Sequence, residues 1–182
     1  MISLRQLRRE VEGFNPRGDR VATAARRRTL RLLELERAAL DRRNYEPGHI
    51  TASGIVFSPD RSAILLVYHR RLERWLQPGG HLERDDGGTM EAAAREVLEE
   101  TGVTPREDEG VWLVGINVHR IPPAKGEPAH LHHDLVWRFM AAEVRLGRPK
   151  ERRQAVWCRV DGLKHHGADE PLLRTVRRAL RH

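Results

Sequence analysis

We predict an α/β fold for this sequence, with a mixed β-sheet covered by helices on both faces and a helical extension in front of it. Short apolar runs separated by turn residues recur from His49 onward, as expected for strands. A helical stretch over 89–102 divides these runs into two groups, and an amphipathic stretch over 169–180 closes the chain. The residues before position 45 show helical periodicity instead, so they are predicted to lie outside the sheet.

The N-terminal segment is predicted to hold two helices. Ser3 can cap a first helix over 4–11, and Asp19 can cap a second helix that reaches about Asp41. A proline–glycine pair then marks a boundary. We therefore divide the chain into an N-terminal helical extension, residues 1–45, and a main domain, residues 46–182.

The elements of the main domain follow from apolar runs and turn residues. Strands are expected at 50–57, 63–68, 111–118, 131–144 and 155–160, with a short extended piece at 75–77. Thr89 is expected to cap the central helix, and Gly102 to end it. The stretch 121–129 contains three prolines and a glycine, which predicts a loop.

Composition restricts the class of protein. The 182 residues are 39% apolar and 32% charged, and no run approaches the roughly 18 apolar residues of a membrane span. The N-terminus has arginines without an apolar stretch after them, so no secretory signal is expected. Cys158 is the single cysteine, which excludes an intrachain disulfide. We expect a cytoplasmic protein that does not enter a membrane.

The net charge of +7 comes almost entirely from arginine, because the chain has only three lysines. Arginine suits phosphate recognition, and a basic balance also attracts nucleic acid. Aromatic residues make up only 5% and are not interleaved with the basic ones, which argues against a surface that stacks single-stranded bases. A nucleic-acid partner is thus left open but not favoured, and the cluster Arg26–Arg28 is interpreted first as a solvated face.

Three carboxylates share one face of the central helix. Glu96, Glu99 and Glu100 have the spacing i, i+3 and i+4, and they follow the turn sequence Pro78-Gly79-Gly80-His81. Like charges on one face repel each other, whereas convergent carboxylates are a common way to hold Mg²⁺ or Mn²⁺. The helix is therefore a candidate metal site.

The order of these residues resembles the signature of the Nudix hydrolase family. The second half of that signature is Arg-Glu-apolar-any-Glu-Glu-any-Gly-apolar. Residues Arg95 to Val103 match at every defined position. The first half departs, because Gly87 stands where the family places its first glutamate. A one-residue insertion in the loop 83–88 restores the spacing, and Asp86 (or its neighbour Asp85) would then replace that glutamate.

The resemblance implies an α/β/α sandwich over about 48–182 and hydrolysis of a diphosphate linkage in a nucleoside diphosphate derivative, by attack of water on phosphorus. It implies Mg²⁺ or Mn²⁺ as cofactor, with ligands from Glu96, Glu99, Glu100 and the Gly80 carbonyl. Arg95 would orient the carboxylates beside the catalytic Glu99 and Glu100. The general base stays open between these two glutamates and an acid on a later loop: Glu109, Glu127 or Asp134.

Further candidates for the substrate pocket lie on the strands. His130, His132 and Asp134 alternate along one strand, so their side chains are expected on one face, where they can bind a transition metal, orient a phosphate or accept a proton. Trp75 is suited either to stack on a base or to pack in the core. Arg70, at the end of a strand, is a candidate for the diphosphate or an exposed residue.

Two other functions remain as alternatives. The first is a non-catalytic module that senses nucleotides or associates with RNA. The second is isopentenyl-diphosphate isomerase, whose chemistry needs a cysteine in the pocket, whereas Cys158 lies far downstream. The substrate is not specified beyond a small nucleotide-type diphosphate. A homodimer is left open, because Leu30 and Leu33 need a partner to cover them.

Overall fold

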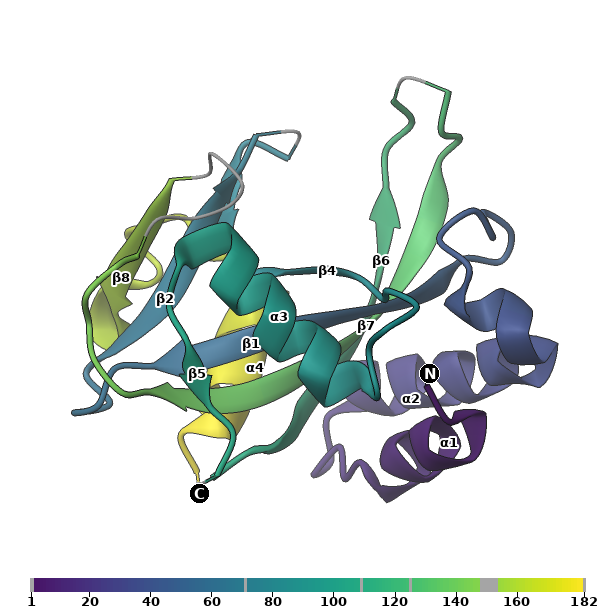
Figure 1. Ribbon diagram of the computed structural model, residues 1–182, viewed down its shortest axis with the longest axis horizontal. Coiled ribbons are helices and arrows are strands. Elements are labelled where there is room, and N and C mark those ends of the chain that lie inside the picture. Colours follow the sequence, from purple (N-terminus) through teal and green to yellow (C-terminus); the bar gives the residue numbers. More distant parts are fainter. Residues whose placement is uncertain (1, 71, 109, 125, 148–153, 182) are drawn as a thin grey trace.

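The computed structural model describes residues 2–70, 72–108, 110–124, 126–147 and 154–181. Within them the chain forms one mixed sheet of eight strands, shown in Figure 1. The strands are β1 (His49–Phe57), β2 (Ala63–His69), β3 (Arg74–Leu76), β4 (Gly79–His81), β5 (Pro105–Arg106), β6 (Trp112–Ile121), β7 (His130–Ala141) and β8 (Ala155–Arg159).

The long parallel pair β1–β7 is the centre of the sheet. It runs without interruption from His49 opposite His132 to Phe57 opposite Met140. On the outer side of β7 lies β6, and β2 carries β3 and β8. Strand β2 pairs with β1 only where Phe57 lies opposite Ile64, and β4 pairs with the earlier part of β1. Strand β4 therefore lies beside the first half of β1, on the edge opposite to β7.

Helices cover both faces of this sheet. Helix α3 (Thr89–Thr101) and helix α4 (Glu170–Ala179) lie on opposite sides of β1 in Figure 1. On the α3 face, Val97 packs in a buried cluster with Val56 and Phe139. On the α4 face, Val176 packs in a second cluster with Val136. The predicted α/β sandwich is confirmed, and alternation along β1 explains it because successive side chains enter opposite clusters.

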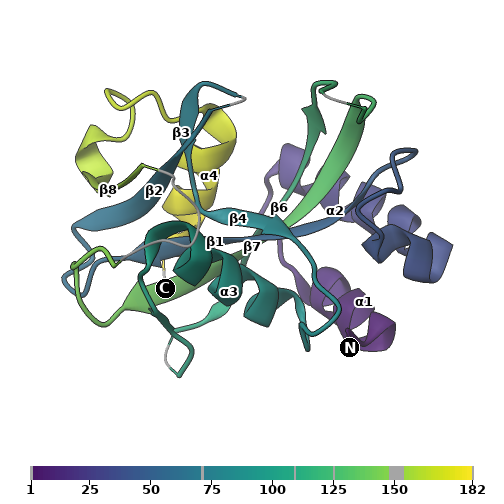
Figure 2. The same cartoon turned by 45° about the horizontal axis from the view of Figure 1, so that its top comes forward.

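The N-terminal helices share the core of the sheet. They are α1 (Leu4–Gly13), α2 (Arg20–Leu32) and the 3₁₀ helix η1 (Leu33–Leu40), and Figure 2 shows α2 beside β6. Val11 and Leu33 are buried in one apolar cluster with Leu135, and Leu30 packs against it. The Thr29 hydroxyl lies 3.0 Å from Nδ1 of His133. The chain itself thus covers the leucines that suggested a dimer.

The prediction of one helix from Asp19 to Asp41 is wrong beyond Leu32. The chain tightens there into 3₁₀ turns, and Glu36 has a φ of 50°, outside the helical range. The tighter path keeps Leu33 and Ala39 buried, so burial overrides the helical preference of this sequence.

The boundaries of α3 and β7 also differ from the predictions. Gly88, not Thr89, is the N-cap of α3. The Thr89 hydroxyl instead donates to Oε2 of Glu10 and accepts from Nε1 of Trp137, both at 3.1 Å, and so links α1, α3 and β7. Gly102 ends α3 with a φ of 69°, as predicted. Strand β7 ends at Ala141, before the predicted Val144, whose carbonyl accepts a bond from Trp157.

Among the described residues, no helix has both the length and the apolar character needed to cross a membrane.

Gly54 sets the distance between α3 and the sheet, and this generates a prediction. A Cβ added there would lie 2.8 Å from Cγ2 of Val97 and 3.2 Å from Cδ2 of Phe139. We expect Gly54→Ala to lower the free energy of unfolding by about 1–3 kcal/mol, because the packed core cannot accept the extra methyl. Urea denaturation followed by circular dichroism measures this change.

Gly13→Ala is the matched control, since nothing lies within 4 Å of the Cβ that it adds. It should leave stability unchanged or raise it by up to about 1 kcal/mol. Equal unfolding midpoints for the two variants would contradict the close packing of α3 on β1.

Candidate active site

A cavity of about 480 Å³ opens between β4, the adjoining parts of β1 and β7, and the carboxylate face of α3. This volume suits a small-molecule ligand. Its lining includes Thr51, Ser53, Gln77, Gly79, Gly80, His81, Glu83, Glu96, Glu99, His119, His132 and Asp134. The fold thus brings the predicted metal helix and the predicted β7 residues His132 and Asp134 to one cavity.

The two glycines of β4 let its backbone approach the carboxylates of α3. The amide of Gly79 donates to Oε2 of Glu100 at 3.1 Å, and Glu100 is only 1% exposed. A Cβ added to Gly80 would lie 2.6 Å from Oε1 of Glu96. Any other residue at Gly80 would therefore displace the Glu96 carboxylate. Glu96 and Glu99 line the cavity. Glu100 instead fixes the start of β4 through the Gly79 amide.

Arg95 connects the acidic groups around the cavity. Its Nη1 donates to Oε1 of Glu96 at 3.0 Å and to Oε2 of Glu99 at 3.2 Å. Its Nη2 donates to the carbonyl of His81 at 2.9 Å. Burial by itself would lower the pKa of Arg95, but hydrogen bonds and charge from Asp86 and Glu96 raise it above its usual value. The guanidinium therefore stays charged and holds the carboxylates in place.

Asp86 is the principal partner of Arg95 outside the helix. Its Oδ1 accepts from Nε of Arg95 at 3.0 Å, its Oδ2 accepts from Nη2 at 3.2 Å, and the side chain is 6% exposed. Oδ2 also accepts the amide of Glu83 at 2.7 Å, which folds the loop back on itself. Asp85 is exposed. Of the two candidates for the missing glutamate, Asp86 is the one in contact with Arg95.

The oxygen donors fit a hard divalent cation. Nη1 of Arg95 lies about equally far from the Glu96 and Glu99 carboxylates, so these two groups converge on a position that favours positive charge. The absent side chain at Gly80 lets the Glu96 carboxylate lie close against the β4 backbone. Carboxylate and carbonyl oxygens are the ligands that Mg²⁺ and Mn²⁺ prefer.

The wall opposite α3 combines a well-oriented carboxylate with neutral imidazoles. Asp134 accepts from Oγ1 of Thr51 at 3.1 Å, Oγ of Ser53 at 2.7 Å and Nε2 of Gln77 at 3.4 Å. Burial lowers the pKa of His132 to about 2 and the pKa of His81 to about 4, and repulsion between neighbouring histidines adds to the effect. Both rings are therefore neutral near pH 7.

Other predicted residues lie elsewhere. His130 is 5% exposed, and its Nδ1 is 2.8 Å from the Pro128 carbonyl. Arg70 is exposed and is not part of the cavity lining. Trp75 packs against the rings of Tyr68 and His166, with centroids 5.4 and 5.2 Å away. Among the later acids, Glu127 pairs with Arg42 at 3.8 Å, and Glu109 falls outside the described residues.

Several cavity residues were not selected from the sequence. Thr51, Ser53 and Gln77 converge on Asp134, and His81 approaches His132, as does His49 from outside the cavity lining. The only signal for this convergence in the sequence was alternation within each strand. Alternation predicts which face of the sheet a side chain lies on, but not which strand lies beside it. The pairing of β1 with both β7 and β4 supplies the missing information.

A second cavity, of about 330 Å³, adjoins the first between α2 and α4. It shares Gln77, His119 and Asp134 with the first cavity, and Arg28 and Arg174 line the second cavity alone. Together the two cavities form a site that extends well beyond the carboxylates.

Three comparisons relate the chain to known proteins. The family model described as "NUDIX domain" matches residues 47–179. No curated protein matches the chain. A NUDIX-family hydrolase from Clostridium perfringens is similar in structure, with a TM-score of 0.52 and 22% identity over 74% of this chain and 98% of that chain.

Two further solved structures are similar. The NUDIX domain of Shewanella oneidensis NrtR, solved in complex with ADP ribose, has a TM-score of 0.54 and 15% identity over 72% of this chain and 85% of its own. A NUDIX hydrolase from Nitrosomonas europaea has a TM-score of 0.51 and 21% identity over 71% of this chain and 86% of its own. At these identities the structures establish the fold.

The family match extends over most of the chain and includes the β4 turn, α3 and β7. It confirms the family predicted from the order of residues around Arg95 and supports the enzyme class predicted with it, a Nudix-type pyrophosphatase. The chain belongs to the NUDIX family.

Proposed function

We propose that this protein is a metal-dependent hydrolase that cleaves a diphosphate linkage in a nucleoside diphosphate derivative. One observation carries the proposal: the Glu96 and Glu99 carboxylates converge at the cavity wall and are held there by Arg95, which Asp86 holds in turn. A cavity that only bound an anionic ligand would gain nothing from two carboxylates in its wall, because they repel the ligand. They become useful when a divalent cation joins them to a phosphate.

The metal would be held by Glu96, Glu99 and the Gly80 carbonyl, with Glu100 beneath them. When bound, Mg²⁺ or Mn²⁺ neutralises charge on the diphosphate and lowers the pKa of water, which makes water a better nucleophile. Arg95 is a positioning residue, since its guanidinium fixes the Glu96 and Glu99 side chains. Gly79 does the same for Glu100 through its amide.

Glu99 is the better candidate for the general base. It lines the cavity, with 21% of its side chain exposed, so a water molecule can reach it. Glu100 is 1% exposed and binds the Gly79 amide, so its position suits a structural role and ligand support. Asp134 also lines the cavity, but three donors occupy its lone pairs, so it suits substrate binding rather than proton transfer.

The second cavity supports a substrate larger than a diphosphate alone. Its lining combines Asp134 and His119 with the apolar Leu172 and with the guanidinium groups of Arg28 and Arg174. Such a mixture suits a nucleoside or another substituent that carries polar or anionic groups. The ADP ribose in the similar Shewanella domain is a ligand of this class. We propose a cytoplasmic enzyme acting on a small molecule.

The other functions have less support. Cys158 lies on β8, buried in the cluster below α4 and outside the cavity lining, so the thiol needed for an isomerase is not at the site. Arg26, from the basic cluster, donates to the backbone carbonyls of Val11 and Glu12 and thereby joins α1 to α2. This contact gives it a structural role that needs no nucleic acid. A module that only senses nucleotides is the alternative that the activity assay tests.

The first prediction for the active site concerns Glu99→Gln. A panel of nucleoside diphosphate derivatives is incubated with the protein and Mg²⁺ or Mn²⁺, and phosphate is measured after a phosphatase converts the products. We expect wild-type cleavage to require the cation, and the variant to lose at least about two orders of magnitude in kcat, the range expected when a catalytic carboxylate is neutralised.

Glu143→Gln is the matched control, because Glu143 is exposed and does not line the cavity. It should retain wild-type activity. Cleavage that persists undiminished in Glu99→Gln would contradict the role of Glu99. A wild-type protein that cleaves nothing in the panel, and whose Tm does not rise with Mg²⁺ or Mn²⁺, would favour the sensing module.

The second prediction concerns Asp86→Asn, which keeps the size of the side chain and removes its charge. Since Asp86 acts through Arg95, we expect activity or apparent Mg²⁺ affinity to fall by about 10- to 100-fold, as for other groups that orient metal ligands. The Mg²⁺ concentration for half-maximal rate is the measurement. Asp85→Asn, at the exposed neighbour, should leave that concentration unchanged, and a similar effect of both variants would reject the specific role of Asp86.

A further inference from the structure

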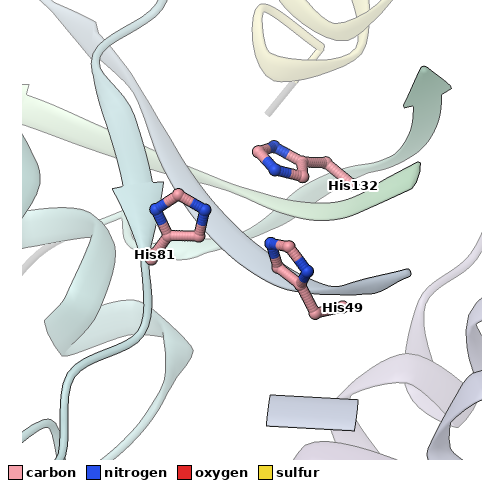
Figure 3. A group of neighbouring side chains, drawn as sticks. All are labelled: His49, His81 and His132. Carbon is pink, nitrogen blue, oxygen red and sulfur yellow. The ribbon is translucent and has the colours of Figure 1, made fainter. Parts of the chain in front are cut away.

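Three histidines from three strands meet beside the cavity, and two of them, His81 and His132, line it. His49 is the first residue of β1, His81 the last of β4, and His132 lies on β7. One ring nitrogen of each lies within 4.8 Å of the others. Figure 3 shows the three rings around a common space, and the sheet explains their meeting, since His49 lies opposite His132 and β4 runs beside β1.

The hydrogen bonds of His49 define which of its nitrogens carries the proton. Its Nδ1 is 3.2 Å from the carbonyl of Asn44, and a carbonyl can only accept, so Nδ1 donates. Nε2 is then the nitrogen with the lone pair. His49 is 0% exposed, and Nε2 is buried without a hydrogen-bond partner in the described part of the chain. Burying an acceptor without a hydrogen-bond partner costs free energy on folding. This cost points to a ligand that binds Nε2 of His49.

The protonation of His132 follows from the same reasoning. The carbonyl of Pro128 accepts from Nδ1 of His130 at 2.8 Å, so Nε2 of His130 carries a lone pair. Nε2 of His132 lies 3.2 Å from that nitrogen and must be the donor. Nδ1 of His132 is therefore left with its lone pair. The tautomers of His49 and His132 are thus fixed. In each ring one nitrogen donates a hydrogen bond, and the other nitrogen keeps a lone pair that can bind a ligand.

This arrangement is the one that protein metal sites use. A ligating imidazole normally donates its other N–H to a carbonyl or a comparable acceptor, which fixes its tautomer and its orientation. His49 has this partner in Asn44, and His132 has it in His130. His81 supplies the third nitrogen, and its backbone is tied to Arg95 through the carbonyl. His49 is buried, and His81 and His132 are half-buried.

We propose that His49, His81 and His132 bind a transition-metal ion of the Zn²⁺ class, at a site separate from the carboxylates of α3. Imidazole nitrogen favours Zn²⁺, Co²⁺, Ni²⁺ or Cu²⁺ over Mg²⁺. Zn–N bonds of about 2.0–2.1 Å place tetrahedral ligands roughly 3.4 Å apart. Since one nitrogen of each ring already lies within 4.8 Å of the others, a metal ion would draw any pair together by at most roughly 1.4 Å.

The fourth ligand position faces the cavity. His81 and His132 line the cavity together with Glu96 and Glu99, so an ion on the histidines has access to the same ligand. Three protein ligands with one open position are typical of a zinc ion that binds water or a substrate group. An anionic part of the substrate can therefore bind this ion directly. The binding of the ion itself does not depend on the proposed hydrolase activity.

The experiment measures metal binding to the full chain after treatment with a chelator. Co²⁺ replaces Zn²⁺ as a spectroscopic probe, because tetrahedral Co²⁺ gives intense visible bands that octahedral Co²⁺ lacks. With Mg²⁺ in large excess to occupy the carboxylates, we expect one Co²⁺ per chain with tetrahedral bands, displaced by Zn²⁺. His49→Gln and His132→Gln should each weaken Co²⁺ binding by at least about 100-fold.

Two control variants separate this site from other metal-binding groups. His165→Gln removes an exposed histidine outside the cavity and should bind Co²⁺ as the wild type does. Glu99→Gln should also keep the tetrahedral bands, although it is expected to lose activity. Circular dichroism establishes whether each variant is folded. If a histidine variant does not fold, the comparison of wild type with Glu99→Gln still shows whether Co²⁺ binding depends on the carboxylates of α3.

Two results would overturn the proposal. One is a wild-type chain that binds no Co²⁺ or binds it only with octahedral spectra. The other is binding that Glu99→Gln abolishes and the folded histidine variants retain, which would place the ion on the carboxylates. Failure of the hydrolase proposal shows instead in the assay of cleavage, which can be negative while the histidines still bind metal.

Discussion

The guanidinium of Arg95 is the interaction on which the site depends. Glu96, Glu99 and Glu100 occupy one face of α3, and without a cation between them their charges oppose both the helix and its packing. Arg95 contacts two of these carboxylates and Asp86, and it reaches the β4 backbone at His81. One side chain thus joins α3, the preceding loop and the strand that forms the cavity wall. Lysine could not replace it, because only the planar fork donates in all these directions at once.

The helix and its charges could be predicted because they depend on local spacing. The i, i+3, i+4 pattern places the glutamates on one face whatever the surroundings, and Gly102 supplies the left-handed turn that ends α3. Asp86 was also accessible from the sequence, as the acid nearest to the interrupted part of the pattern. The end of α2 was not, because the turn at Leu33 depends on the core that receives it. The same holds for Thr89, whose hydroxyl binds partners on α1 and β7.

The histidine cluster shows the limit of local reasoning most clearly. His49, His81 and His132 are far apart in the sequence, and each by itself is an unremarkable polar residue on a strand. Alternation predicts that His132 and Asp134 share a face, but the neighbours on that face come from the parallel pairing of β1 with β7 and the short pairing of β4 with β1. A shift of β7 by one residue would direct His132 to the opposite face of the sheet. Long-range register, rather than composition, therefore creates this cluster.

The segment before the family match contributes directly to the cavity. The NUDIX model begins at residue 47, yet Asn44 holds the tautomer of His49 and Arg42 lines the cavity. Both residues follow η1, whose position depends on the burial of Leu33 and Ala39 against the sheet. The N-terminal helices thus act on the site through packing: they place the chain at 41–48 so that a carbonyl meets Nδ1 of His49. Because the opposite ring nitrogen faces the cluster, the binding properties of this wall are set in part by residues outside the common fold.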